Sequence, residues 1–249
     1  IGKLIARYFA KNYDVDHIKV AIVARHRQRL EEVKQSMDVG LLIADVHDQQ
    51  SVDDAIKQVK VVINTVGPFT LYGQPVVDAC VRFGTHYVDL TGESNWIKKM
   101  IQTYHEQAAE KGVFIVPSCG FDSVPSDIGS FLAAETLKKR YNEDATLIKH
   151  TVMDVKGGVS GGTLASMMVV LDHATREDLT NNHLLDPTPA DQGNLIKRDH
   201  ELFLPHYDPD FKTWTHMFVM ASANSRIVRR TAGYLQLEDV GYSKNVKYM

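Results

Sequence analysis

The stretch Val61–Cys80, VVINTVGPFTLYGQPVVDAC, joins a β-branched run to a stiff, glycine-containing loop of a kind that can bind a nucleotide. Five of its first six residues are β-branched, which predicts a strand buried on both faces of a parallel sheet. At Gly67 and Pro68, glycine lets the backbone approach a ligand and proline stiffens the loop. In a doubly wound sheet, such a loop lines the crevice that binds a dinucleotide. We therefore expect Thr65, Val66, Gly67 and Pro68 to contact a cofactor, with a plain strand-to-helix turn as the alternative.

Residues at three further points could bind the same cofactor. A strand predicted at 18–24 is followed by Arg25, and arginine there accommodates the 2′-phosphate of NADP, whereas a carboxylate would bind the ribose of NAD. The next predicted strand, 39–44, stops at Asp45, whose carboxylate could contact the adenine edge. Gly2 precedes a helical pattern, as the last glycine of a phosphate-binding turn does. We favour NADP(H) over NAD(H); a solvated basic helix start at Arg25 and a turn-forming Asp45 are the alternatives.

Two carboxylates come at the end of the strand predicted at 86–90. Asp89 and Glu93 lie at the same expected edge of the sheet as the glycine-proline loop. They could hold a substrate amine or hydroxyl, or act as a general acid or base. Because surface carboxylates also cap helices, capping is the alternative for both residues.

A literal G-x-S-x-G pattern surrounds Ser160, between a strand predicted at 146–156 and a helical pattern. This is the context of a nucleophile elbow, for which His206 or His216 with Asp191 would complete the catalytic set in the required order. The alternating strands and helices, however, lie upstream of this point instead of around it. We therefore favour a glycine-rich substrate or cofactor loop in which Ser160 orients the substrate, and we keep a serine hydrolase as a rival function.

The elements that must position these residues alternate with βαβ spacing, which predicts an α/β, Rossmann-type doubly wound parallel sheet. Residues 1–118 are expected to form this NAD(P)-binding domain. Residues 119–249 are expected to form a second, α+β domain that binds substrate or forms a homodimer. The pattern at 146–156 alternates as in an antiparallel strand, and Ser51 and Ser126 are expected to cap helices.

The chain opens inside the motif that should come first. We therefore expect the first strand and the first two glycines of the Rossmann domain to lie upstream of Ile1, and the second domain to be incomplete. A sheet without its central strand would expose two strand edges.

Composition narrows the class of protein. The chain has 249 residues and a formal net charge of -3, which gives no electrostatic reason to expect nucleic acid. Its two cysteines, Cys80 and Cys119, cannot make a disulfide framework and have no metal-ligand spacing. We therefore expect no metal and a reducing, intracellular, cytoplasmic setting. No apolar run reaches the ~18 residues that span a bilayer.

Several blocks of this sequence together resemble the saccharopine dehydrogenase-like oxidoreductase family, and the resemblance covers nearly the whole chain. The blocks are NTVGPFTLYGQPVVDAC (64–80), YVDLTGE (87–93), the segment 104–129, GGVSGGT (157–163) and, more weakly, ANSRIVRRT (223–231).

The resemblance implies a Rossmann domain with NAD(P)-dependent oxidoreductase chemistry, followed by an α+β domain. It implies cofactor contact at the positions already singled out, which are Gly2, Arg25, Asp45, Thr65, Val66, Gly67 and Pro68. Members of the family include enoyl reductases acting on lipid-linked substrates in glycolipid synthesis, and proteins at lipid droplets or membranes. We expect hydride transfer between NADP(H) and a hydrophobic or lipid-linked substrate. The rival is a non-catalytic Rossmann-fold protein at a lipid droplet or membrane, and the catalytic residues stay open.

Overall fold

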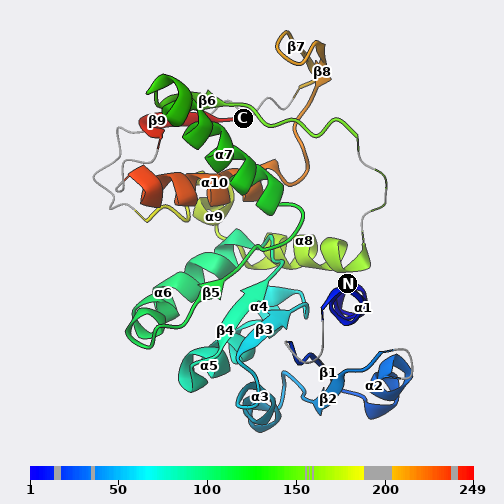
Figure 1. Ribbon diagram of the computed structural model, residues 1–249. Helices are drawn as coiled ribbons and strands as arrows, with labels where there is room; N and C mark the ends of the chain where they lie inside the picture. Colours follow the sequence, from blue (N-terminus) through cyan, green and yellow to red (C-terminus); the bar gives the residue numbers. More distant parts are fainter. Residues whose placement is uncertain are drawn as a thin grey trace. The chain divides into compact units, whose positions relative to one another are not determined.

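The computed structural model describes residues 1–13, 18–34, 37–154, 156, 158, 160–187, 204–236 and 241–249. Contacts divide the chain, drawn in Figure 1, into two compact units. The first unit consists of residues 1–89 and 100–117, and the second of residues 90–99 and 118–249. Residues 90–99 therefore group with the second unit, whereas the boundary expected after residue 118 would place them in the first.

The first unit is built from parallel strands joined by helices. Its strands are β1 (Ala21–Ala24), β2 (Gly40–Ile43), β3 (Val61–Asn64), β4 (His86–Asp89) and β5 (Ile115–Val116). Its helices are α1 (Gly2–Asn12), α2 (Arg27–Lys34), α3 (Gln49–Ile56), α4 (Phe69–Tyr72), α5 (Gln74–Phe83) and the later part of α6 (Ser94–Glu110). All its described strand pairs are parallel. The α/β, Rossmann-type class predicted from the sequence is confirmed.

The parallel strands form two separate sheets among the described residues. β1 pairs with β2, and β3, β4 and β5 form a second sheet in that order. β1 and β3 do not pair with each other, so each has a free edge among the described residues. One face of β3 is also open, because Val61 and Ile63 are 52% and 43% exposed. The expected burial of this strand on both faces is therefore wrong for the described residues.

Helix boundaries in the first unit follow local chemistry. Helix α5 has a proline in its first turn and ends at Gly84, whose φ of 76° is the left-handed conformation that glycine adopts without strain. Helix α3 begins earlier than expected, with Asp48 as its N-cap. The Asp48 side chain accepts the backbone N–H groups of Gln50 and Ser51, so Ser51 lies inside the helix and the expected Ser51 cap is wrong.

The second unit combines a parallel strand pair, five helices and a hairpin in its described part. Its core lies between helices α7 (Val124–Tyr141) and α10 (Ala221–Gln236) and the pair of β6 (Ala145–Ile148) with β9 (Tyr242–Tyr248). The other elements are the start of α6, α8 (Gly161–His173), α9 (Arg176–Thr180), β7 (His206–Asp208) and β8 (Thr213–Thr215). β7 and β8 form the antiparallel hairpin.

Two expectations for the second unit need correction. The strand expected at 146–156 is only the four-residue β6, and it pairs in parallel with β9. Residues 149–154 lie outside any strand, and the register pairing of β6 with β9 ends at Ile148 and Tyr248. Helix α7 begins at Val124, two residues before the expected cap. Ser126 is buried inside its first turn, where its Oγ lies 3.0 Å from His150 Nδ1.

Among the residues that the structure describes, no helix is both long and apolar enough to cross a membrane.

Candidate cofactor-binding site

The first turn of α1 lies against the carboxyl end of β3. An ideal Cβ placed on Gly2 would lie 3.0 Å from Thr65 Oγ1, so only glycine lets the helix start this close to the strand end without a shift. The first amides of a helix have no intrahelical acceptor, and the helix dipole favours negative charge there. The structure therefore brings together Gly2 and Thr65 and offers a helix N-terminus suited to a pyrophosphate.

Helix α1 is held in this place by the β1–β2 sheet. Ala6 of α1 shares a buried cluster with Val39, and Val20 and Leu41 pack against that cluster. The same helix therefore contacts the β1–β2 sheet through its side and the end of β3 through Gly2. The N-terminus of α1 therefore lies beside the end of β3, while the middle of the helix packs on the β1–β2 sheet.

Arg25 and Asp45 follow the ends of neighbouring strands. Ala24 is the register partner of Ile43, and the Ala44 N–H donates to Ala24 O at 3.4 Å. Arg25 is exposed and makes no side-chain hydrogen bond or ion pair with the described residues. An unpaired guanidinium after β1 fits the 2′-phosphate of NADP, which it can bind through two parallel hydrogen bonds.

Asp45 shapes the loop in which it lies. Its Oδ1 accepts the His47 N–H at 3.0 Å, and its own N–H donates to Ser51 Oγ at 2.9 Å. The His47 ring meets the Tyr72 ring edge-on, with centroids 5.7 Å apart, which joins this loop to α4. These contacts are those of a turn-forming aspartate, the alternative expected for Asp45. The contact of Asp45 with the adenine edge stays a prediction.

The Asn64 side chain fixes the start of the loop that follows β3 by a hydrogen bond. The Val66 N–H donates to Asn64 Oδ1 at 3.0 Å, which forms an Asx-type turn. The backbone amide of Val66 is therefore engaged within the loop instead of facing a ligand. Pro68 then accepts backbone hydrogen bonds from Leu71 and Tyr72 as α4 begins, so the loop is anchored at both ends.

Asn64 belongs to a buried chain of hydrogen bonds that crosses from β3 to β4. Asn64 Nδ2 donates to Tyr87 Oη at 3.2 Å, and the Tyr87 hydroxyl donates to Asp89 Oδ2 at 2.8 Å. Asn64, Tyr87 and Asp89 are 4%, 0% and 2% exposed. Burial, followed by the neighbouring Asp89 carboxylate, raises the pKa of Tyr87 far above its ordinary value, so its hydroxyl stays protonated. Asp89 is thus buried inside the first unit and bonded to Tyr87, and its contact with a substrate stays a prediction.

Sequence reasoning missed Asn64 and Tyr87. A signal for Asn64 exists, because it is the only residue between Val61 and Val66 that is not β-branched. A polar side chain at the end of a largely apolar strand needs a hydrogen-bond partner when it is buried. That partner, Tyr87, is 23 residues away on another strand, which the sequence alone does not reveal.

Glu93 belongs to a buried polar cluster in the second unit. The Ser166 hydroxyl of α8 donates to Glu93 Oε1 at 2.8 Å, and the Glu93 N–H donates to Thr91 Oγ1 at 3.1 Å. The Ser118 hydroxyl in turn donates to Thr91 O at 2.7 Å. Glu93 is thus buried and bonded to α8, and its role in substrate orientation stays a prediction.

Ser160 caps helix α8. Its Oγ accepts the Thr163 N–H at 3.2 Å and lies 3.0 Å from Thr163 Oγ1. The histidines expected to activate it bond elsewhere, His206 to Thr215 and His216 to the Met217 carbonyl. Residue 191 lies outside the described residues, and the strand expected before the elbow is absent from 149–154. The geometry around Ser160 is that of an N-cap, so it does not support the hydrolase.

The cysteines and the acidic side chains are the remaining candidates for a reactive thiol or a metal site. Burial raises the pKa of the Cys80 thiol to about 12, which keeps it protonated and unreactive. Cys119 is exposed. Within the described ranges, no group of three or more His, Cys, Asp or Glu side chains is arranged to hold a metal ion.

Parallel strands, a helix N-terminus beside a strand end and an exposed arginine after β1 define a dinucleotide-binding domain of the Rossmann class. Residues 1–116 match the family model described as the saccharopine dehydrogenase NADP binding domain. The chain therefore contains a saccharopine dehydrogenase NADP-binding domain, and the cofactor of this domain is NADP(H).

Three curated relatives extend this result. A Mycobacterium tuberculosis protein, whose name assigns it provisionally as a trans-acting enoyl reductase, is 35% identical over 261 residues, covering 100% of this chain and 61% of its own. The saccharopine dehydrogenase-like oxidoreductase of Bos taurus is 31% identical, covering 93% of this chain and 55% of its own. The lipid droplet localized protein of Caenorhabditis elegans is 32% identical, covering 72% of this chain and 44% of its own. The chain therefore spans about three-fifths or less of the length of these relatives.

Proposed function

We propose that this chain takes part in the NADPH-dependent reduction of an activated carbon–carbon double bond in a hydrophobic or lipid-linked substrate. The observation that carries the proposal is the approach of Gly2 to Thr65, together with Arg25 after β1, whose side chain has no partner among the described residues. Support for the reaction class comes from the relative named as an enoyl reductase, which matches this chain from end to end.

In this proposal, the residues of this chain bind the cofactor and orient the substrate. The reduction takes its hydride from NADPH, which supplies the redox chemistry when bound. The first turn of α1 binds the pyrophosphate, and Arg25 binds the 2′-phosphate. The loop 65–68 forms one wall of the site and is held by Asn64. Glu93 stays the candidate for substrate orientation, and no proton donor is assigned.

The proposal is tested by following NADPH oxidation at 340 nm with crotonyl-coenzyme A and dodecenoyl-coenzyme A. Each is compared with the saturated thioester of the same length, which cannot accept a hydride. We expect oxidation with the unsaturated thioesters alone, and faster oxidation with the longer chain. NADPH binding without oxidation by either enoyl thioester would contradict the reductase and favour the second function below.

The second candidate function is attachment to a lipid surface, and the β7–β8 hairpin favours it. Tyr207 and Trp214 are register partners with rings in edge-to-face contact, and they remain 52% and 71% exposed. Such amphipathic rings prefer the interface between membrane and water. The relative from Caenorhabditis elegans is named for its lipid droplet location.

Flotation with phosphatidylcholine vesicles tests this second function. The protein is expected to float with the vesicles, and Tyr207→Ser with Trp214→Ser should abolish flotation. Tyr141→Ser is the matched control, because Tyr141 is an exposed tyrosine at the end of α7. Equal flotation of the hairpin variant and the control would contradict a role for the hairpin.

A further inference from the structure

The hydrogen-bond chain from Val66 to Asp89 lies at the carboxyl ends of two adjacent strands. Asn64 and Asp89 are register partners across β3 and β4, and Tyr87 is two residues before Asp89 on the same face of β4. The three side chains therefore meet on one face of the sheet, directly beneath the loop that the proposed function assigns to the cofactor.

The chain fixes the orientation of the Asn64 amide. Asn64 Nδ2 faces the Tyr87 hydroxyl, which leaves Oδ1 for the Val66 N–H. The Tyr87 hydroxyl in turn gives its only proton to Asp89, so it can accept from Asn64 but cannot donate to it. Each member thus sets the orientation of the next, from a carboxylate at one end to a backbone amide of the loop at the other.

Burial makes these orientations costly to change. All three side chains are at most 4% exposed, so water does not replace a lost partner easily. A loop that must present its backbone to a cofactor gains from being fixed beforehand, because less conformational freedom is lost on binding.

We propose that Asn64, Tyr87 and Asp89 are positioning residues for the cofactor, which hold the 65–68 loop in the shape that receives it. This inference rests on the proposed NADPH binding. It also gives Asp89 a part in cofactor binding, in place of the contact with substrate expected from the sequence.

The experiment compares Tyr87→Phe with Tyr104→Phe. The Tyr104 hydroxyl also donates to a carboxylate in the first unit, Asp78 Oδ1 at 3.4 Å, and Tyr104 is 7% exposed, but it has no bond to the loop. NADPH affinity is measured by nicotinamide fluorescence and folding by the midpoint of thermal unfolding. Tyr87→Phe is expected to raise the Kd for NADPH about five- to tenfold, and Tyr104→Phe less than about twofold.

A second readout does not depend on the cofactor. Hydrogen exchange of the Val66 amide in the free protein reports directly on its bond to Asn64. Tyr87→Phe and Asn64→Ala are expected to speed this exchange at least about tenfold relative to Tyr104→Phe. Asn64→Asp keeps the acceptor for Val66 and should restore much of the protection that Asn64→Ala loses.

The outcomes separate the two proposals. A wild-type protein that does not bind NADPH would contradict the proposed function, while the exchange of the Val66 amide would still decide the positioning role. A folded Tyr87→Phe protein with unchanged Val66 exchange would overturn the inference. So would a Kd for NADPH that changes equally in the Tyr87 and Tyr104 variants.

Discussion

Gly2 of α1 lies so close to Thr65 that an added Cβ would come within 3.0 Å of the threonine Oγ1. Helix α1 is packed on the β1–β2 sheet through Ala6, so it cannot shift freely to make room. A side chain at Gly2 would therefore require Thr65 or the start of α1 to shift by a few tenths of an ångström.

Gly2→Ala is expected to weaken NADPH binding about tenfold, or ~1.4 kcal/mol, because the helix start or Thr65 must shift. Gly129→Ala is the control, since a Cβ there meets nothing within 4 Å inside α7. That variant should stabilise the protein by about 0.5–1 kcal/mol and leave the Kd unchanged. Isothermal titration with NADPH and thermal unfolding measure both effects. Normal affinity in Gly2→Ala would contradict the close approach.

Arg82→Ala is expected to lower the free energy of unfolding by about 1 kcal/mol at neutral pH. The Arg82 guanidinium on α5 donates to both oxygens of Asp53 on α3, at 2.8 and 2.6 Å, and to Asp78 at 2.7 Å. Urea unfolding of the variant and of Lys57→Ala measures the difference. Lys57→Ala loses a pair with Asp54 at 3.4 Å and, like Arg82→Ala, a cation–π contact with the Phe83 ring.

The loss of unfolding free energy in Arg82→Ala should depend on pH. The hydrogen bond from Arg82 is the main cause that lowers the pKa of Asp53 in the folded protein. A lowered carboxyl pKa gives stability that is present above the unfolded pKa of about 4 and is lost as pH falls through the folded pKa. The deficit should therefore shrink between pH 5 and pH 2.5. An equal deficit at both ends would show that packing, and not the ion pair, is lost.

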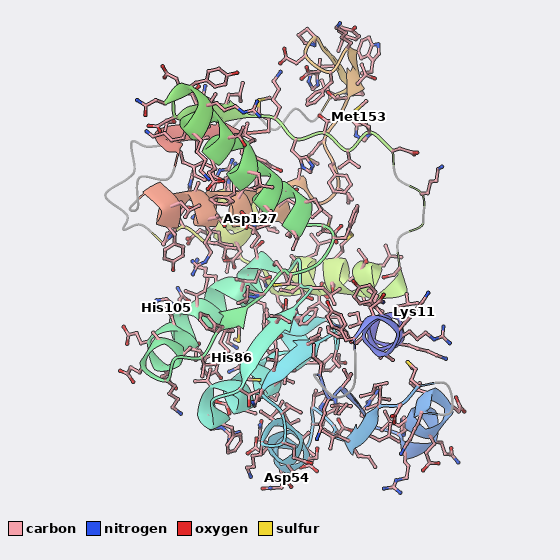
Figure 2. All side chains as sticks on the ribbon, viewed as in Figure 1. Lys11, Asp54, His86, His105, Asp127 and Met153 are labelled. Carbon is pink, nitrogen blue, oxygen red and sulfur yellow. The ribbon has the colours of Figure 1, made fainter. Side chains whose placement is uncertain are left out.

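Asp127→Asn is expected to stabilise the protein at neutral pH. Asp127 lies on α7 (Figure 2), where its Oδ2 accepts from the Thr231 hydroxyl at 3.0 Å. Its buried Oδ1 has no hydrogen-bond partner among the described residues. Burial raises the pKa of Asp127, while the Thr231 hydroxyl acts in the opposite direction.

The sign of the pH dependence follows from this raised pKa. The wild-type protein loses stability as pH rises through the folded pKa, because a buried carboxylate must then ionise. The advantage of Asp127→Asn should therefore grow from pH 4 to pH 8 in thermal unfolding. Asp122→Asn, at an exposed position, is the control. A constant difference across this range would contradict the assignment.

The sequence predicts the elements of the first unit well because their signals are local. A β-branched run predicts β3, and glycine and proline mark where it ends. Capping is less certain, because Asp48 and Ser51 both stand near the start of α3 and only one position has the geometry of an N-cap.

What the sequence does not predict depends on partners far along the chain. Strand β6 pairs with β9, almost 100 residues later, so its length and parallel direction have no local signal. The same holds in the site, where Asn64, Tyr87 and Asp89 act together only after β3 and β4 pair. Residue types alone therefore place Asp89 at the correct strand end but do not reveal Tyr87 as its partner.

Separate titrations with NADPH and NADH, followed by nicotinamide fluorescence, test the central claim most directly. They are made on the wild type, on Arg25→Ala and on Lys34→Ala, which removes an exposed lysine from the last turn of α2. We expect the wild type to bind NADPH at least about tenfold more tightly than NADH, since Arg25 binds the 2′-phosphate. Arg25→Ala should remove this preference and Lys34→Ala should keep it. Equal affinity for both cofactors, unchanged by Arg25→Ala, would contradict the account.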